Sequence, residues 1–149
     1  NQDVLVKRNW RQVPLSELVD AQLAFLEDRL EQVEREGPDV VIQPGAAESI
    51  SMALHEMATN AEKYGALSVP EGRVEIHWRL EAHEGEPRFV LTWHESGGPP
   101  VAEPSQRGFG SRVIRDVPAR KLRADVTCRF DPEGFSFALS CPVSHVLEL

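Results

Sequence analysis

Cysteine is scarce in this sequence, which has only Cys128 and Cys141 among its 149 residues. Two cysteines are too few for the disulfide framework of a small secreted domain, and we expect both to be reduced structural thiols. Long hydrophobic runs are also missing, since no apolar stretch approaches the roughly 20 residues of a membrane-spanning helix. The first residues show no basic region followed by an apolar one, so they predict no signal peptide. These absences favour a cytoplasmic domain without membrane contact.

Basic residues are outnumbered, with 16 Lys and Arg against 24 Asp and Glu, a formal net charge of -8. Sequence-independent binding of nucleic acid needs a basic surface, so this composition argues against it. A single nucleotide remains compatible, because backbone N–H groups, a metal and one or two cations can hold phosphate locally. Hydrophobic residues make up 41% and charged residues 27% of the chain, which is typical of one folded domain. The sequence begins without Met, and we expect a domain excised from a longer protein.

Hydrophobic periodicity predicts helices alternating with short strands. The expected elements, in order, are a helix following Pro14, a strand at 40–42, a long helix at 46–64 capped by Gly65, a hairpin with its turn at 81–87, a loop at 96–107, a helix at 108–123 interrupted by Pro118, and a second hairpin at 124–141. Part of the stretch 29–36 could already be strand. Hairpin links favour a mixed, mostly antiparallel sheet, with about three helices on one face of a two-layer α+β sandwich. The domain itself should span 14–142, with 1–13 as its linker or start and 143–149 as a peripheral tail.

One face of the long helix carries a carboxylate, an amide and a cation. Glu56, Asn60 and Lys63 are spaced i, i+4 and i+7, so their side chains share that face. Asn60 can offer an oxygen to Mg²⁺, which prefers hard oxygen ligands and often bridges substrate phosphates. Lys63 can offset phosphate charge, and Glu56 can accept a proton or orient a nucleophile. A solvated helix face with an incidental Glu–Lys pattern is the alternative.

A carboxylate followed by two glycines ends the second strand of the first hairpin. Glu95 can accept hydrogen bonds from an exocyclic amine such as that of adenine, and Gly97 and Gly98 allow the backbone to approach a ligand closely. A plain Gly-Gly-Pro turn without a ligand is the alternative interpretation of the same residues.

A second glycine motif, formed by Gly108, Phe109, Gly110 and Ser111, opens the next predicted helix. Backbone N–H groups at a helix N-terminus bind anions. The spacing matches neither the dinucleotide-binding fingerprint nor the phosphate-binding loop of P-loop NTPases. A simple helix cap is therefore the alternative to a phosphate site.

These three pieces, in this order, resemble the catalytic and ATP-binding domain of histidine kinases, on the Bergerat fold shared with gyrase-type ATPases. The residues that carry the closest resemblance are the block HEMATNAEKYGALS at 55–68 and the motif Trp93-His94-Glu95. They are similar to the HWE subfamily of sensor kinases, and the similarity runs from about Trp10 to Pro142. It implies a protein-histidine kinase that uses ATP and Mg²⁺.

The resemblance also implies roles for single residues. Asn60 would ligate Mg²⁺, Glu56 would polarise the acceptor imidazole, and Lys63 and Tyr64 would contact the nucleotide. Glu95 stands where most histidine kinases have Asp, the residue that reads the adenine amine. His55 is grouped with Glu56 at the catalytic position, and packing or hydrogen bonding near the site is its preferred interpretation.

The glycines would shape the rest of the nucleotide site. Gly97 and Gly98 would border the adenine, residues 99–107 would form a short ATP lid, and the motif at 108–111 would let that lid meet the phosphates. The phosphoacceptor His of the family lies on a separate helical dimerisation domain, for which we find no helix in this sequence. We therefore expect that domain in the same parent chain, a homodimeric parent and an indirect link to a response regulator.

Two alternatives remain open at this level. A different member of the same fold would be an ATPase or a kinase acting on Ser. A degenerate module that docks partners would retain the fold without catalysis, although the presence of Glu56, Asn60 and Lys63 argues against it.

Overall fold

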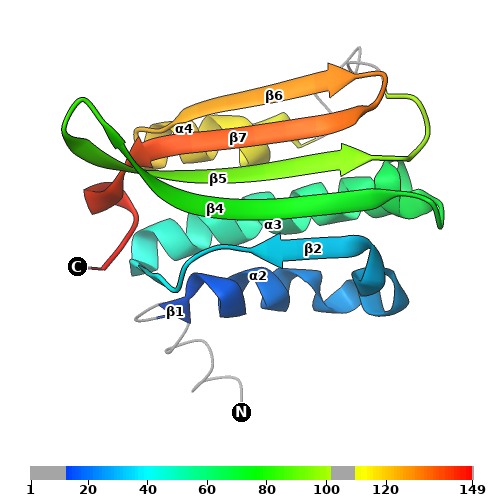
Figure 1. The fold of residues 1–149 in the computed structure, drawn as a ribbon, viewed down its shortest axis with the longest axis horizontal. Coiled ribbons are helices and arrows are strands. Elements are labelled where there is room, and N and C mark those ends of the chain that lie inside the picture. The colour runs from blue at the N-terminus through cyan, green and yellow to red at the C-terminus, as the bar shows by residue number, and fades with distance from the viewer. Residues whose placement is uncertain (1–12, 102–109, 149) are drawn as a thin grey trace.

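The protein, as a computed structural model, is described for residues 13–101 and 110–148, apart from the side chain of His83. Its helices lie on one face of a five-stranded sheet (Figure 1). The α-helices are α2 (Leu15–Leu23), α3 (Pro44–Lys63) and α4 (Val117–Lys121). The strands are β1 (Val13–Pro14), β2 (Val33–Glu36), β3 (Val41–Ile42), β4 (Arg73–His83), β5 (Glu86–Ser96), β6 (Asp125–Asp131) and β7 (Gly134–Pro142). This arrangement confirms the two-layer α+β prediction.

The main sheet has the strand order β2-β4-β5-β7-β6, and a separate pair joins β1 to β3. Strand β2 runs parallel to β4, whereas the other neighbours in the main sheet are antiparallel. The predicted mixed, mostly antiparallel sheet is therefore correct. The parallel strands β2 and β4 require a crossover connection, and this connection contains β3 and α3.

Helix α3 lies across the inner face of the sheet and carries the apolar stripe predicted from the sequence. Its buried residues include Ile50, Leu54 and Met57, which meet Phe89 and Trp93 in one hydrophobic cluster. Burial of side chains of this size contributes roughly 1.5–3 kcal/mol each. The helix begins at Pro44, two residues before the predicted start, because the first turn of a helix tolerates a proline without an N–H group.

The first predicted helix is shorter than its leucine spacing suggests. Helix α2 ends at Leu23, and the chain continues as 3₁₀ structure over Ala24–Gln32. Glu27 interrupts that segment with a φ of 53°, a left-handed conformation that an α-helix cannot contain. Leu26 is nevertheless buried. The spacing of apolar residues therefore indicated correctly which side chains are buried, but it did not indicate a regular helix there. The strand expected within 29–36 is β2.

The first hairpin is longer than predicted. Strands β4 and β5 pair up to His83 and Glu86, so the turn is only Glu84 and Gly85 and not the whole stretch 81–87. Both turn residues have positive φ, 53° and 85°, as a type I′ turn requires. Glu81 and Glu86, which were predicted as part of the turn, are exposed strand residues.

The segment predicted as a helix at 108–123 divides into two types of helix. Residues Arg112–Asp116 form a π-helical turn, and α4 follows it. Pro118 does not interrupt this structure, because it occupies the first turn of α4 and is buried there. Residues 102–109 lie outside the described part, which includes most of the predicted ATP lid together with Gly108 and Phe109.

The C-terminal segment was expected to be peripheral, and this expectation is wrong. Val143, Val146 and Leu147 are buried in the hydrophobic core. The carbonyl of Val146 accepts a hydrogen bond from the N–H of Gln43 at 2.7 Å, directly before α3. Residues 143–147 therefore complete the domain.

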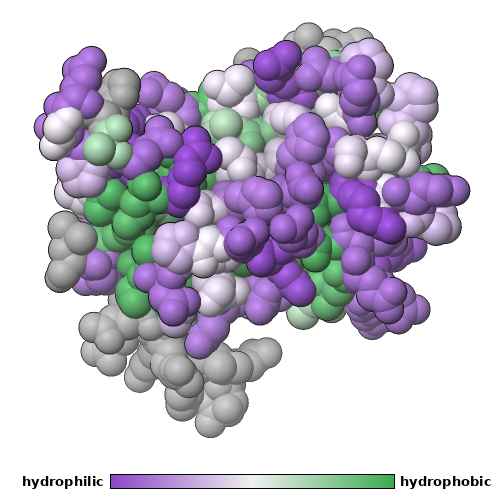
Figure 2. Space-filling view, viewed as in Figure 1, coloured by the Kyte–Doolittle hydropathy of each residue, from purple (hydrophilic) through white to green (hydrophobic). Residues whose placement is uncertain are grey.

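The face seen in Figure 2 is mostly hydrophilic, with a few hydrophobic patches. Inward residues such as Ile76, Leu91 and Leu139 are buried, and the residues between them alternate outward. No helix within 13–101 or 110–148 is both long and apolar enough to cross a membrane. Cys128 and Cys141 are free thiols, as predicted.

Candidate functional site: two glycine-rich loops against helix α3

Glu95 is the residue before the last one of β5, and its side chain lies on the inner, buried face of that strand. Trp93 and Glu95 share that face because side chains two residues apart in a strand point the same way. The Glu95 side chain is almost fully buried, with the residue only 3% exposed. Trp93 donates its Nε1–H to Glu95 Oε2 at 2.9 Å, and the backbone N–H of Ala66 donates to Oε1 at 3.1 Å. The orientation of the carboxylate is therefore fixed by two donors, one from β5 and one from the segment after α3.

The electrostatics of Glu95 follow from this burial. Desolvation raises the pKa of the carboxyl above its ordinary value of 4.5, while the hydrogen bonds from Trp93 and Ala66 oppose the rise. An ionised carboxylate has about four acceptor positions. Two are used by the protein, which leaves acceptor capacity for an amine presented by a ligand.

Glycines permit the close approach of the loops around Glu95. A Cβ atom at Gly65 would overlap Glu95 Oε1, and one at Gly98 would lie 2.6 Å from the Cα of Ala66. Gly97 has a φ of 76°, a conformation that favours glycine. The loop after β5 thus lies directly on the segment that follows α3. The approach of Gly97 and Gly98 to a ligand stays a prediction.

Two supporting residues were given no role at the site from the sequence. A Cβ atom at Gly134 would overlap the carbonyl oxygen of Glu95, so β7 lies against the backbone of Glu95 at this point. The second residue, Trp93, positions the carboxylate. The Trp-x-Glu spacing could have revealed Trp93, since residues i and i+2 of a strand are neighbours on one face. No pattern along the chain indicates Gly134.

The second glycine motif reaches α3 one to two turns earlier. Gly110 has a φ of 92°, and a Cβ atom there would lie 2.5 Å from Glu56 Cγ and 2.9 Å from Glu56 Oε2. The carbonyl of Gly110 accepts the N–H of Ile114 at 2.8 Å, which starts the π-helical turn, and Ser111 beside it is buried. Gly110, three residues beyond the predicted lid, therefore lies against the side chain of Glu56.

The fold of this chain is similar to that of solved structures, and its sequence is similar to that of curated relatives. The catalytic domain of histidine kinase ThkA matches 88% of this chain and 94% of its own with a TM-score of 0.62 at 15% identity. The histidine kinase domain of the Erythrobacter litoralis EL346 blue-light activated histidine kinase matches 89% of this chain and 62% of its own, with a TM-score of 0.62 at 19% identity. A blue-light-activated histidine kinase of Brucella anthropi is 34% identical over 143 residues, 95% of this chain. No protein-family model matches.

The fold is that of a histidine kinase catalytic domain. The predicted resemblance to histidine kinases is confirmed in sequence and in structure. The chain spans 29% of the length of the Brucella anthropi relative, so the match concerns one region of a longer kinase. Membership of the HWE subfamily stays a prediction.

The remaining site residues of this kinase-type domain lie along one face of α3. Glu56 and Asn60 are half-buried, whereas Lys63 and Tyr64 are exposed, Tyr64 to 72%. The backbone carbonyl of Asn60 accepts the N–H groups of Tyr64 and Gly65 at 2.8 and 3.2 Å, which ends the helix. Gly65 is therefore at the C-terminus of α3, as predicted, and the roles of these side chains toward a ligand remain predictions.

The ring of His55 packs against an aromatic ring outside α3. His55 is exposed, and its ring centroid lies 5.1 Å from that of Phe25 in the 3₁₀ segment that follows α2. This contact agrees with the packing interpretation of His55. A catalytic role for His55 stays a prediction.

The donor set on α3 suits a hard cation. Glu56 and Asn60 stand one helical turn apart and are both half-buried, and carboxylate and amide oxygens are ligands that Mg²⁺ accepts alongside water and phosphate.

Another potential metal-ligand group, unexpected from the sequence, lies on the outer face of the sheet. There the parallel pairing of β2 and β4 brings Glu34, Glu36 and His77 within 4.8 Å of one another. Both glutamates are exposed, and His77 already pairs with Glu34 at 3.6 Å.

Proposed function

We propose that this chain is the ATP-binding catalytic domain of a sensor histidine kinase. It would transfer the γ-phosphoryl group of ATP to a histidine on a separate helical dimerisation domain of the same parent chain. The observation that carries the proposal is the meeting of two glycine-rich loops with one helix. One loop brings Glu95 to the end of α3, and the other brings Gly110 to Glu56.

The base would bind at Glu95. A carboxylate held by two N–H donors is fixed in orientation, and its remaining lone pairs can accept the exocyclic amine of adenine. Because Glu95 is buried, a bound base that leaves its carboxylate without a hydrogen-bond donor would lose binding free energy. A base that lacks a donor facing Glu95 would therefore bind weakly. Selectivity for adenine over guanine would follow from this one contact.

The phosphates would lie along α3 toward Gly110. Asn60 would hold Mg²⁺, which when bound offsets the charge of the triphosphate. Lys63 would add a positive charge, and Tyr64 would contact the nucleotide. Glu56 would accept a hydrogen bond from the incoming imidazole and orient its nitrogen toward the γ-phosphoryl group. The glycine motif at 108–111 would bring backbone N–H groups to the phosphates.

The parent protein supplies the rest of the system in this proposal. The acceptor domain would form a homodimer and pass the phosphoryl group to a response regulator in the cytoplasm. Matches that span 29% of the relatives' length are consistent with further domains in the parent. The HWE assignment would rest on the His55-Glu56 and Trp93-x-Glu95 pairs.

Nucleotide titration with and without Mg²⁺ tests binding. Wild-type chain should bind ATP in a Mg²⁺-dependent manner, and Asn60→Ala should remove the dependence on Mg²⁺, since a metal ligand is lost. Glu48→Ala is a matched control on the same helix, because Glu48 is exposed near its opposite end. Absence of ATP binding at millimolar concentration would refute the proposal. Unchanged Mg²⁺-dependent binding by Asn60→Ala would instead favour a docking module.

A radioassay of the full-length parent tests the reaction. Incubation with γ-labelled ATP should give acid-labile phosphate, the property of phosphohistidine. Acid-stable phosphate would indicate a Ser kinase on the same fold, and release of phosphate without protein labelling would indicate an ATPase. Glu56→Ala should lower the labelling while ATP is still bound.

A further inference from the structure

Two strands at one edge of the sheet bring an imidazole and two carboxylates together on its outer face. Glu34 and Glu36 lie on β2, the edge strand, and His77 lies opposite Glu36 on β4. One ligand atom from each side chain lies within 4.8 Å of the other two. Among the side chains that the structure describes, this is the only group of three or more His, Cys, Asp or Glu residues with that property.

Strand alternation explains why these three side chains meet. Val33 and Val74 pair across β2 and β4 and are both buried, so the residue that follows each of them faces outward. The outward residues of the two strands are Glu34 and Glu36 on β2 and Glu75 and His77 on β4. The parallel register therefore assembles the group from segments that are far apart in the sequence.

The ring of His77 presents an unsatisfied nitrogen to this group. Its Nε2 atom is shielded from solvent and has no hydrogen-bond partner within the described part of the chain. Glu34 Oε2 lies 3.6 Å from it, which is too long for a hydrogen bond. Two ligand atoms that each lie about 2.0–2.1 Å from a tetrahedral Zn²⁺ ion are about 3.4 Å apart. The observed distance therefore fits two ligands of one metal ion better than a donor and its acceptor.

The charge around this imidazole favours a cation. Glu75 is the cross-strand neighbour of Glu34, and like charges opposite each other on neighbouring strands are destabilising. The flanking basic residues Arg35 and Arg79 each pair with an acidic residue outside the group. A divalent cation would relieve the repulsion between the carboxylates without displacing either of these ion pairs.

We propose that Glu34, Glu36 and His77 bind a divalent transition-metal ion of the Zn²⁺ type. An imidazole ligand favours Zn²⁺ over Mg²⁺ and Ca²⁺, which take oxygen ligands. Zn²⁺ accepts three protein ligands and leaves its fourth position to water. The ion would join β2 to β4 and stabilise an edge strand in which only Val33 is buried. The inference does not depend on ATP or on the proposed kinase activity, because the helices lie on the other face of the sheet (Figure 1).

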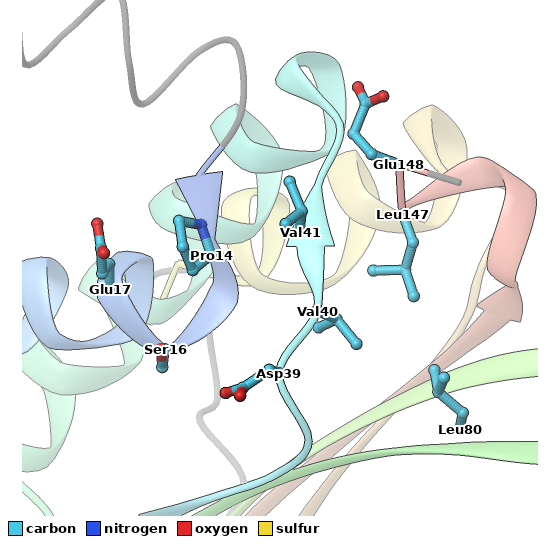
Figure 3. Close-up of a pocket in the computed structure, with 9 residues that line it drawn as sticks. All are labelled: Pro14, Ser16, Glu17, Asp39, Val40, Val41, Leu80, Leu147 and Glu148. Carbon is cyan, nitrogen blue, oxygen red and sulfur yellow. The ribbon is translucent and has the colours of Figure 1, made fainter.

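Another acidic surface of the protein provides a contrast. Glu17, Asp39 and Glu148 line a groove, and Figure 3 shows their carboxylates apart from one another. None of the nine described residues that line this groove is His or Cys. Negative charge without a converging imidazole is thus available elsewhere on the same domain, and it supplies a control for the metal site.

Calorimetric titration of the 1–149 chain with Zn²⁺, in the absence of nucleotide, tests the proposal. His77→Ala and Glu36→Gln should each lower the Zn²⁺ affinity at least about tenfold, the smallest loss typical even of groups that only support a ligand. Two controls should leave the affinity unchanged. They are His94→Ala, an exposed imidazole on the adjacent strand β5, and Glu148→Gln in the groove. Absence of Zn²⁺ binding, an unchanged affinity of His77→Ala, or equal affinities for Zn²⁺ and Mg²⁺ would overturn the proposal.

NMR of the histidine side chains locates the metal ion. In ¹⁵N-labelled chain, Zn²⁺ should shift the Nε2 signal of His77 more than its Nδ1 signal, because Nε2 faces Glu34. A larger shift of any other histidine would place the ion elsewhere and refute the assignment.

Hydrogen exchange provides a readout of the link between the strands. Zn²⁺ should slow the amide exchange of β2 in the wild-type chain, because an ion that binds only the folded strand pair stabilises it. Glu36→Gln should show no such slowing. This variant keeps the shape of an exposed side chain, so misfolding does not explain its loss of the response. Exchange of β2 that is unaffected by bound Zn²⁺ would contradict the proposed link.

Discussion

The two ends of the candidate nucleotide site differ in how completely the protein has built them. At the base end, Glu95 is 3% exposed and bonded to Trp93 and Ala66. At the phosphate end, Glu56 is half-buried against Gly110, and Lys63 is exposed. In the proposed function, base recognition would therefore belong to the hydrophobic core, while phosphate positioning would lie on the surface of α3. A base end that is already ordered would lower the entropic cost of nucleotide binding. Side chains at the phosphate end could still move during phosphoryl transfer.

The largest expected effect comes from Glu95→Ala. We expect about a 100-fold loss of ATP affinity, because a charge-assisted hydrogen bond is worth about 1.5–3 kcal/mol. The free energy of unfolding should also fall by about 2–4 kcal/mol, since two buried N–H donors lose their acceptor. Calorimetric titration and urea unfolding measure the two quantities. Glu56→Ala is the matched change at the phosphate end and should alter the unfolding free energy by less than about 0.5 kcal/mol. Equal destabilisation by the two variants would contradict the comparison.

Gly65→Ala also tests the packing at the base end, and its expected effect on stability and ATP affinity is smaller than that of Glu95→Ala. Its Cβ would overlap Glu95 Oε1, so the carboxylate must move at a cost of about 1–3 kcal/mol in the free energy of unfolding. ATP affinity should fall together with stability. Gly45→Ala is the control, because a Cβ there meets nothing within 4 Å. If both variants unfold at the same urea concentration, the packing described around Glu95 is wrong.

Gly110→Ala tests the phosphate end. The substitution places a Cβ against Glu56 at a φ of 92°, so we expect phosphoryl transfer to fall about tenfold through displaced geometry. Adenosine affinity should not change, because adenosine lacks phosphates and Glu95 is untouched. The assay compares transfer to the acceptor domain with adenosine binding by calorimetry. Loss of adenosine binding would show that the two ends are coupled.

The smallest expected effect concerns pH. Burial raises the pKa of Glu95 above 4.5 in the folded protein, so the folded state binds more protons than the unfolded state above that value. The stability linked to Glu95 is therefore fully present below pH 4.5 and is lost as pH rises through the raised pKa. Glu95→Gln should abolish this loss. Urea unfolding of both proteins from about pH 4 to about pH 8 measures it, and parallel pH profiles would contradict the pKa assignment.

The sequence predicted regular elements best where periodicity and turn chemistry agree. The stripe of α3, the glycine at its end and the second hairpin were each located within about two residues. Prediction failed where the local pattern was ambiguous. The leucine spacing after Pro14 continued through Glu27, whose positive φ ends any regular helix, and the short apolar segment at the C-terminus gave no sign of its burial.

The chemistry of the site was visible along the chain, but its assembly was not. Glu56, Asn60 and Lys63 share a helix face by spacing alone, and Trp93 and Glu95 share a strand face by alternation. The contact of Ala66 with Glu95 joins residues 29 positions apart. The contact of Gly110 with Glu56 depends likewise on how α3 packs on the sheet.

The sequence by itself determined the residue types of the site, the helix that carries half of them and the family that they resemble, because these are local patterns. Only the tertiary structure decided that Glu95 is buried, that β7 and the end of α3 enclose it, and that the C-terminal residues complete the core. Those features arise from packing between segments distant in the chain. Burial and close approach are properties of the whole fold, and no local pattern encodes them.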